Sequence, residues 1–384
     1  MKTSKENKDM KRYGNIYEKI CTMDNLRLAH QHAREDKLFY KEVKMVDADP
    51  DKYLGMIHEM LVNESYEVSE YTVSIINDKG KERELAKLPY FPDRIIQWAI
   101  MLQVEDIFMK TFCTHTCASV KQRGIKEASR LTRKFLKDRE GSKYCLKIDV
   151  SKFYPNINHD IMKMLLRKKF KDKQLLNLLD RIIDSYPKEN GIPIGSYLSQ
   201  FLANFYLTYF DHWLKEDKHI KMVVRFMDDM TIYGESKEEL HNLMNEIHQY
   251  MNDKLDLKIK DNWQIFPTNV RGVDFVGYRF FYDFILLRKS TCKSFKRKMI
   301  IIKHKLEKGV IINEKDWCSA NSYAGWLKWC DSYRLFEKYI EPIIPALLTY
   351  YRLIIVNNLS THEIEISTYR YYNKLMSKKG RKAI

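Results

Sequence analysis

The chain has 384 residues, more than one hydrophobic core usually holds, so its length allows two or three cooperating units. Its 45% hydrophobic and 13% aromatic content excludes wholesale disorder, and its net charge of +16 favours a partner that carries phosphate groups. No apolar run nears the ~18 residues of a membrane span, and the seven cysteines lack the spacing of a disulfide scaffold. We therefore expect a folded cytoplasmic protein that binds nucleic acid and no membrane.

The N-terminal part of the chain has the periodicity of helices, followed by that of strands. Apolar positions at helical spacing predict helices over 24–35 and 50–62, with Asp24 and Asp49 as candidate caps. Two short stretches with strand character, YTVSII and ERELAKL, then flank the turn sequence NDKGK. This arrangement predicts a β-hairpin.

The middle of the chain alternates between helical and strand patterns. Residues 93–138 predict two helices, and the β-favouring run YCLKIDV predicts a buried strand that ends near Asp149. Helical spacing returns over 159–185. A glycine-containing break at 191–195 precedes an amphipathic helix that runs to Trp213.

A second hairpin is predicted by MVVRFMDDMTIYG, where two apolar runs flank Asp228 and Asp229. Both carboxylates then lie at the bend. A helix over 237–255 and short strands over 255–287 follow, and the basic remainder from Ser290 has a helical pattern.

Three acidic residues that are distant along the chain are expected to meet in one antiparallel sheet. Asp149 ends one strand, and the Asp228–Asp229 bend can lie beside it. Nucleotidyl transfer needs such convergence, because carboxylates must hold two metal ions about 3.5–4 Å apart. An Asp-Asp pair at a turn is by itself ordinarily a solvated bend. The prediction therefore depends on the strand and the hairpin together.

Four segments, LKIDVSKFYPNI, GIPIGSYLSQFLANFYL, RFMDD and VDFVGY, resemble in order and spacing the palm motifs of bacterial reverse transcriptases. The resemblance spans residues 60–335. It implies an α+β right-hand polymerase with a helical N-terminal extension (1–66), fingers and palm around an antiparallel sheet (67–287), and a basic helical thumb with a C-terminal tail (288–384). It also implies RNA-directed DNA polymerase activity.

The resemblance assigns catalysis and metal binding to the three acidic residues, with Val150 as a further metal-binding position. The implied cofactors are two Mg²⁺ ions, which Mn²⁺ can replace. Phe226 stands where the family's box has tyrosine, so the ring is kept and a hydroxyl is lost. Tyr154 matches the steric gate that excludes a ribose 2′-hydroxyl and so selects dNTPs; a core aromatic is the other interpretation.

The first hairpin resembles the fingers strands that fold over the incoming triphosphate. Arg83 offers a planar fork for phosphate oxygens, and Lys79 and Lys81 lie beside it in sequence. A solvated charged turn is the competing interpretation. Arg94 matches a nucleic-acid-binding position of the family, or it pairs with Asp93 at a helix start.

The run GIPIGSYLSQ is the most discriminating feature. Its Ile194, Gly195, Ser199 and Gln200 resemble the variant found in diversity-generating retroelements, where most bacterial relatives have Q-G-x-x-x-S-P. We take Ile194, Gly195 and Gln200 as nucleotide-binding positions. In that family the variant accompanies error-prone copying at template adenines, and a lost hydrogen bond of ~1 kcal/mol weakens base discrimination several-fold. Gly195 can instead be only a turn glycine.

The C-terminal third resembles the primer grip and thumb. Gly277 and Tyr278 fall in the primer-grip strand, and basic residues recur along the next helix. Those we take as nucleic-acid-binding are Lys293, Lys296 and Arg297. A solvated face is the alternative, and the KKGRK tail at 378–382 either adds affinity for RNA or is disordered.

Two local patterns argue against simple assignments. The family's next motif carries a lysine near the incoming nucleotide, but Asn262 stands at that register, which leaves the role of Lys260 open. Cys113, His115 and Cys117 are too closely spaced, without a second ligand pair, to predict a zinc site.

The resemblance implies template RNA, cDNA and dNTPs as partners, and in addition a structured noncoding RNA and a small accessory protein. Two other functions remain open. One is a reverse transcriptase of a phage-defence system that uses its own noncoding RNA. The other is a maturase-like RNA-binding protein without polymerase activity, which a broken set of acidic residues would indicate; here all three are present.

Overall fold

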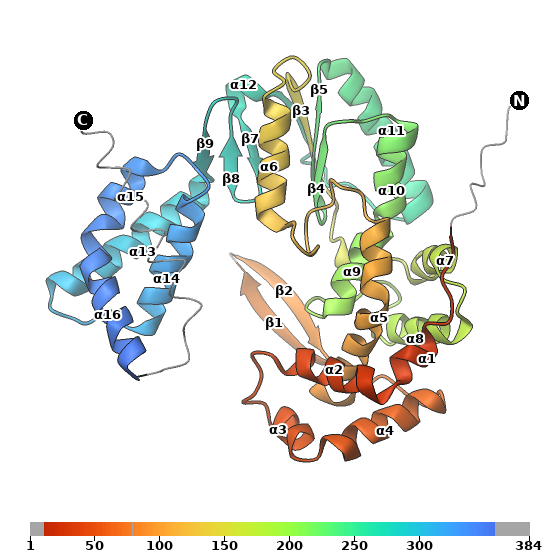
Figure 1. Cartoon of the computed structure of the whole chain (residues 1–384). Helices are drawn as coiled ribbons and strands as arrows, with labels where there is room; N and C mark the ends of the chain where they lie inside the picture. The colour runs from red at the N-terminus through yellow and green to blue at the C-terminus, as the bar shows by residue number, and fades with distance from the viewer. Residues whose placement is uncertain (1–10, 79, 358–384) are drawn as a thin grey trace, which may run out of the picture. The chain divides into compact units, whose positions relative to one another are not determined.

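The computed structural model describes residues 11–78 and 80–357, with only the backbone described at residues 78, 81 and 351–357. The chain divides into two compact units, of which unit 1 runs to Phe266 and unit 2 begins at Pro267 (Figure 1). Helices and antiparallel sheets occur in both, which confirms the α+β class. Within the described residues no helix has the length and apolarity needed to cross a bilayer.

Unit 1 is mostly helical. Its helices and helical turns are α1 (Tyr17–Cys21), α2 (Met23–Arg34), α3 (Lys41–Ala48), α4 (Pro50–Val62), η1 (Tyr90–Arg94), α5 (Ile95–Thr111), α6 (Gly124–Leu136), η2 (Tyr154–Asn156), α7 (His159–Lys169), α8 (Lys173–Asp184), α9 (Tyr197–Tyr206), α10 (Thr208–His212), η3 (Trp213–Asp217) and α11 (Lys237–Leu255). Its strands are β1 (Thr72–Asp78), β2 (Lys81–Lys87), β3 (Tyr144–Asp149), β4 (Val223–Phe226), β5 (Asp229–Gly234) and β6 (Gln264–Pro267).

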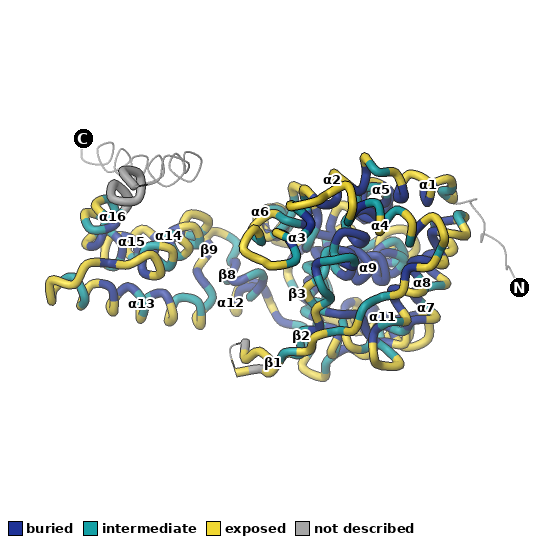
Figure 2. The backbone as a smooth tube through the Cα atoms, turned by 90° about the horizontal axis from the view of Figure 1, so that it is seen from below, coloured by how far each residue is buried: buried dark blue, intermediate teal, exposed yellow. Residues whose placement is uncertain are grey.

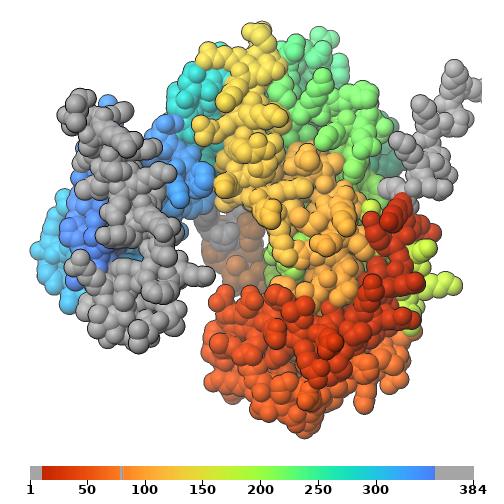
Figure 3. All heavy atoms as spheres, viewed as in Figure 1, coloured from red at the N-terminus to blue at the C-terminus, as the bar shows by residue number. Residues whose placement is uncertain are grey.

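The N-terminal helices pack into the same core as the rest of unit 1. Buried residues from Ile16 to Leu61 belong to one continuous hydrophobic cluster that reaches Ile259. In Figure 3 the red N-terminal helices and the orange α5 form a continuous surface. Asp49 caps α4, since its Oδ1 accepts a hydrogen bond from Lys52 N at 3.2 Å. Thr22, two residues before the predicted Asp24, caps α2 instead.

The predicted first hairpin is present. Strands β1 and β2 pair antiparallel, with Ile76 opposite Arg83 and Asp78 opposite Lys81. Side chains on this hairpin are largely exposed, and Ile75 is 71% exposed (Figure 2). The hydrogen bonds between its two strands therefore hold most of the hairpin together.

The predicted strand and second hairpin form one four-stranded sheet in the order β4-β5-β3-β6. The register places Asp149 directly opposite Asp229. Val150 N also donates to Asp228 O at 3.2 Å. Because side chains alternate across a strand, Ile148 and Met230 point to the opposite face, where both are fully buried. At this end of the sheet, Asp149 and Asp229 thus lie on the face opposite to that of Ile148 and Met230.

Helices α5 and α9 form the aromatic centre of unit 1. The buried Phe108 ring lies 5.1 Å from Phe205, 5.7 Å from Phe170 and 6.1 Å from Phe201. Each fully buried phenyl side chain contributes ~1.5–3 kcal/mol. This packing fixes α9, whose N-terminus follows the GIPIG segment, against the rest of unit 1.

Unit 2 joins a small sheet to a helical part. Its elements are α12 (Thr268–Arg271), β7 (Val273–Phe275), β8 (Tyr278–Phe280), β9 (Ile285–Leu287), α13 (Lys289–Glu307), α14 (Glu314–Leu327), α15 (Tyr333–Tyr339), η4 (Glu341–Ile343) and α16 (Ile344–Asn357). Asp331 N donates to Ile285 O at 2.8 Å, and Asp331 Oδ2 accepts from Ile285 N. The sheet is therefore tied to the helices after it, and the expected boundary at 287/288 lies inside this unit.

Candidate functional site

The bend of the second hairpin presents two acidic residues at the end of the palm sheet. The β-branched and aromatic runs on either side form β4 and β5, which leaves Met227 and Asp228 to make the turn. Met227 has a φ of +60°, a left-handed conformation that costs ~1–2 kcal/mol for a residue with a side chain. The bend is therefore held by contacts around it.

A buried network behind the sheet holds this bend. Arg225 is fully buried, and its Nη1 donates to the main-chain oxygen of Met227 at 3.1 Å. Its Nε donates to Asp211 Oδ1 at 2.8 Å, and Nη1 also donates to Asn204 Oδ1 at 3.0 Å. Two residues of the helical segment after GIPIG thus fix the arginine that fixes the bend. No local pattern in the sequence indicates this network.

The three predicted acidic residues lie together in unit 1. Asp149 and Asp229 are cross-strand partners, and Asp228 is the next residue around the bend. Lysines neutralise two of them: Lys260 Nζ contacts Asp149 Oδ1, and Lys147 Nζ lies 3.2 Å from Asp229 Oδ1 and 3.3 Å from Oδ2. No three acidic, imidazole or thiol groups in the described part of the chain are arranged to hold a metal ion as they stand.

The pKa values show that these carboxylates crowd one another. Burial, together with the charges of Asp149 and Asp228 and against the opposing charge of Lys147, raises the pKa of Asp229 to about 6. Burial, followed by the charge of Asp149, also raises the pKa of Asp228. Divalent cations would relieve this repulsion, and oxygen ligands suit Mg²⁺. The carboxylate oxygens of these three residues therefore fit metal ions, which would take over from Lys260 and Lys147 as the counter-charges.

Lys260 occupies the place where the sequence register suggested Asn262. A β-bridge between Val150 and Ile259 aligns the segment with the end of β3, and Lys260 N donates to Asp149 O at 2.9 Å. This alignment brings the Lys260 side chain to Asp149. A lysine is therefore present beside the acidic residues, two positions earlier in the sequence than expected.

Tyr154 lies against the bend. Its hydroxyl donates to Met227 Sδ at 3.9 Å, and burial, followed by the charge of Asp228, raises its pKa. The ring also packs on the edge of the main core. Both interpretations from the sequence are thus compatible with its place, beside Asp228 and partly buried.

Arg83 is exposed on the fingers hairpin, and its charge weakly opposes the rise that burial causes in the pKa of Asp228. The hairpin therefore brings this guanidinium within electrostatic range of the acidic residues. Lys79 falls outside the described residues, and of Lys81 only the backbone is described.

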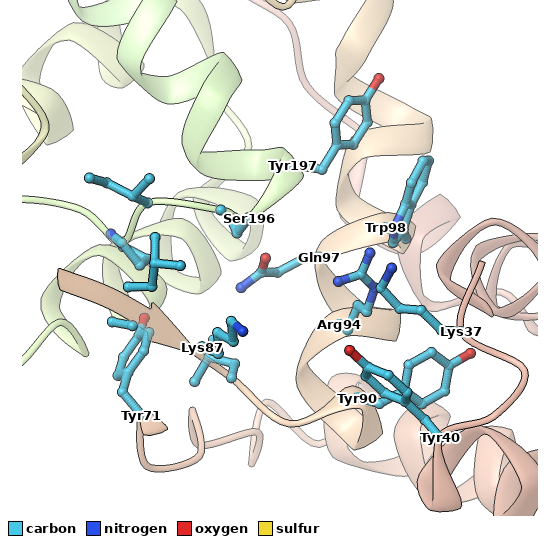
Figure 4. A pocket seen from close by; sticks show the side chains of 16 residues that line it. Lys37, Tyr40, Tyr71, Lys87, Tyr90, Arg94, Gln97, Trp98, Ser196 and Tyr197 are labelled. Carbon is cyan, nitrogen blue, oxygen red and sulfur yellow. The ribbon is translucent and has the colours of Figure 1, made fainter. Parts of the chain in front are cut away.

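Arg94, Ile194 and Gly195 line one cavity in unit 1 of about 310 Å³ (Figure 4). Arg94 does not pair with Asp93: its Nε donates to Ala33 O at 3.1 Å, whereas Asp93 Oδ1 accepts from the Tyr66 hydroxyl at 2.6 Å. Gly195 has a φ of +114° with open space where a Cβ would lie, so the conformation and not crowding favours glycine. Gly195 therefore serves as a turn glycine.

Gln200 lies outside this cavity. It is partly buried in the first turn of α9, where its N donates to Ser196 O at 3.4 Å. Ser199, which the GIPIG resemblance also included, is buried, and its hydroxyl lies 2.8 Å from that of Ser196. These two residues shape the start of the helix.

The predicted residues of unit 2 divide into buried and exposed ones. Gly277 has a φ of +86°, and a Cβ there would come within 2.4 Å of the Trp326 ring. Tyr278 is buried, and its hydroxyl donates to Trp326 O at 3.0 Å. Along α13, Lys293 and Arg297 are exposed, and Lys296 lies 5.9 Å from the centroid of the Tyr339 ring. The KKGRK tail lies outside the described residues.

The expectation against zinc concerned Cys113, His115 and Cys117. All three are buried, and His115 Nε2 lies 3.4 Å from Asp211 Oδ1 at the edge of the Arg225 network. The main chain here pairs with β4, since Arg225 N donates to His115 O at 3.0 Å and Thr116 forms a parallel bridge to Arg225. The segment thus has a structural place beside the bend.

Comparison with known proteins agrees with this geometry. The model of the family "Reverse transcriptase (RNA-dependent DNA polymerase)" matches residues 75–280. The chain is 24% identical over 230 residues to Protein YkfC of Escherichia coli K12, covering 57% of this chain and 54% of that protein. It is 26% identical over 182 residues to the group II intron-encoded protein LtrA of Lactococcus lactis, covering 45% and 29%.

Solved structures give a more distant likeness. Telomerase from Candida albicans, in complex with a fragment of telomeric RNA, has a TM-score of 0.47 and 11% identity, covering 76% of this chain and 61% of that chain. Among the curated relatives, the chain matches about half the length of YkfC and less than a third of the length of LtrA.

Proposed function

The chain belongs to the reverse transcriptase (RNA-dependent DNA polymerase) family, and we propose that it copies RNA into DNA by nucleotidyl transfer at Asp149, Asp228 and Asp229. One observation carries the proposal: the sheet register sets Asp149 opposite Asp229, with Asp228 at the adjoining bend. Carboxylates from separate segments of the chain then lie close together, as the binding of two metal ions requires.

The residues around the bend have distinct proposed roles. The three carboxylates, with the main-chain oxygen of Val150, would hold two Mg²⁺ ions, or Mn²⁺ in their place. When bound, these ions supply the positive charge that activates the primer hydroxyl and neutralises the triphosphate. Arg83 binds phosphate oxygens of the dNTP, and the Tyr154 ring fills the space of a ribose 2′-hydroxyl. The position of both residues near Asp228 supports this assignment.

The test is primer extension on an RNA template with dNTPs and Mg²⁺. Wild-type protein is compared with Asp228→Ala and with Asp253→Ala, which changes an exposed aspartate on α11. We expect extension by wild type and Asp253→Ala only. Equal extension by Asp228→Ala would remove the proposed chemistry.

A finer proposal concerns the biological system. We propose that the enzyme copies a structured noncoding RNA, together with a small accessory protein, and makes errors at template adenines as in diversity-generating retroelements. The apolar Ile194 at the cavity wall supports this, because it offers no hydrogen bond near a paired base.

Sequencing the cDNA made by wild type and Ile194→Gln tests the finer proposal. We expect errors concentrated at adenines in wild type and several-fold fewer in the variant. A low, uniform error rate at all four bases in wild type would favour the phage-defence alternative, which shares the chemistry.

A further inference from the structure

The first two residues of the GIPIG run pack along the segment that carries Tyr154. Gly191 N donates to Ile157 O at 2.8 Å, and Ile192 N donates to the main-chain oxygen of Tyr154 at 3.1 Å. The Ile192 side chain is buried in the main core of unit 1, which anchors the run there. The main chain of Tyr154 is therefore held by a part of the chain almost 40 residues away.

Gly191 lies directly against the main chain next to Tyr154. Its φ is +101°, and a Cβ there would come within 2.9 Å of Pro155 O and 3.1 Å of Pro155 Cα. Main-chain atoms cannot move aside as the end of a flexible side chain can. Gly195, in the same run, has open space at its Cβ position. A side chain at position 191 would therefore push on Pro155, and so on the residue before it.

His159 fixes the carbonyl group of the same glycine. The histidine is 8% exposed, and its Nε2 lies 2.7 Å from Gly191 O. Because a carbonyl oxygen can only accept, Nε2 is the donor. His159 is the first residue of α7, whose N-cap Asn158 accepts from Ile161 N at 3.1 Å. Both polar main-chain groups of Gly191 are thus bonded to the segment that follows Tyr154.

The Tyr154 ring extends from this anchored main chain to the acidic bend. Its hydroxyl donates to the sulfur of Met227, the residue before Asp228, at 3.9 Å. In the proposed function the ring rejects a ribose by occupying the space of the 2′-hydroxyl. Rejection by contact needs a side chain that is held in place, and functional geometries must be kept within ~0.5 Å. The anchor of the Tyr154 main chain therefore bears on how well the ring can select.

We propose that Gly191 and His159 are positioning residues for sugar selection: they hold the main chain of Tyr154 so that its ring admits a dNTP and rejects an rNTP. Both act through Tyr154 and not by contact with the nucleotide. The inference deepens the proposed function and rests on it, since it takes Tyr154 as the residue that excludes ribose.

The test measures primer extension by the full chain on an RNA template with Mg²⁺, one nucleotide at a time. The quantity compared is the ratio of kcat/KM for dATP to kcat/KM for ATP opposite a template uridine. This ratio does not depend on how much of a variant is folded, because both values scale with the same active concentration. We expect wild type to prefer dATP, and Tyr154→Val shows how much of that preference the ring supplies.

The two positioning residues should change this ratio. Gly191→Ala should lower it about 10-fold, because a displacement of ~1 Å in such a site can change a rate by ~100-fold. His159→Leu removes the donor to Gly191 O and should lower the ratio by less. His159→Gln should keep the ratio of wild type, since the glutamine amide can donate in place of the imidazole Nε2.

Gly124→Ala is the matched control for backbone strain. Gly124 begins α6 and has a φ of +70°, with no atom within 4 Å of its Cβ position. Its substitution strains the main chain as Gly191→Ala does, but it presses on no neighbouring main chain. We therefore expect the ratio of wild type.

Three results would overturn the inference. One is the wild-type ratio in both Gly191→Ala and His159→Leu while Tyr154→Val loses selection, which leaves the proposed function intact. Another is an equal loss in Gly124→Ala and Gly191→Ala, because strain alone would then explain it. The third is the wild-type ratio in Tyr154→Val, which would remove the ring from sugar selection. If wild type extends the primer with neither nucleotide, the proposed function fails and this inference falls with it.

Discussion

Two aspartates of unit 1 show how the protein treats buried negative charge in opposite ways. Burial pushes the pKa of Asp211 upward, but the charges of Arg225 and His115 outweigh it and hold that pKa far below its usual range. Burial raises the pKa of Asp229 to about 6, and Lys147 offsets it only in part. The first charge is compensated within the fold, and the second leaves room for an external cation. The difference separates a structural acid from one that we propose to be catalytic.

The largest expected effect is at the structural acid. Asp211→Asn leaves Arg225 buried without its counter-charge and should lower the free energy of unfolding by about 3–5 kcal/mol. Denaturant unfolding monitored by circular dichroism measures this. Asp217→Asn, an exposed change in the helical turn that follows, should stay within ~0.5 kcal/mol. Comparable values for the two variants would break the comparison.

The Arg225 network should also affect the bend through Met227. Arg225→Lys keeps the charge but cannot donate at once to Asp211, Asn204 and the main-chain oxygen of Met227. We expect a fall of about 10-fold in kcat with little change in KM for dNTP, because the bend carries Asp228.

The matched control for that experiment is Thr116→Val. Thr116 Oγ1 donates to Asp211 Oδ2 at 2.8 Å and accepts from Arg225 Nη2 at 3.4 Å, but within the described residues it makes no hydrogen bond to Met227. Its loss should cost ~1–3 kcal/mol of stability without a fall in kcat. If both variants lose activity only in proportion to stability, Arg225 is a structural residue alone.

The sequence predicts elements whose signals are local. Helix α4 agrees at both ends, because Asp49 and Pro50 mark its start, and α11 agrees over its whole predicted range. The sequence also predicts the strand and the hairpin that bring Asp149 to Asp228, because their apolar runs are adjacent to the acidic residues.

What the sequence does not show depends on contacts between remote segments. A charged residue such as Arg225 is usually exposed, and its burial follows from partners 14 and 21 residues away. The place of Lys260 depends on a bridge to Val150. The burial of Gln97 depends on further segments that close a cavity around it. Long-range contacts, and not residue type, decide all three.

The smallest effect concerns the pH dependence at Asp229. Its folded pKa of about 6 exceeds the usual value of a free aspartate, 3.8, so the folded protein binds more protons between these pH values. Through this group the free energy of unfolding therefore falls as pH rises from about 4 through 6. Without divalent cations, Asp229→Asn should gain about 1–3 kcal/mol relative to wild type between pH 5 and pH 8. Asp211→Asn should show no such gain over that range, because Asp211 is already ionised there. Parallel stability curves for Asp229→Asn and wild type would mean that Lys147 compensates the carboxylate as fully as Arg225 compensates Asp211.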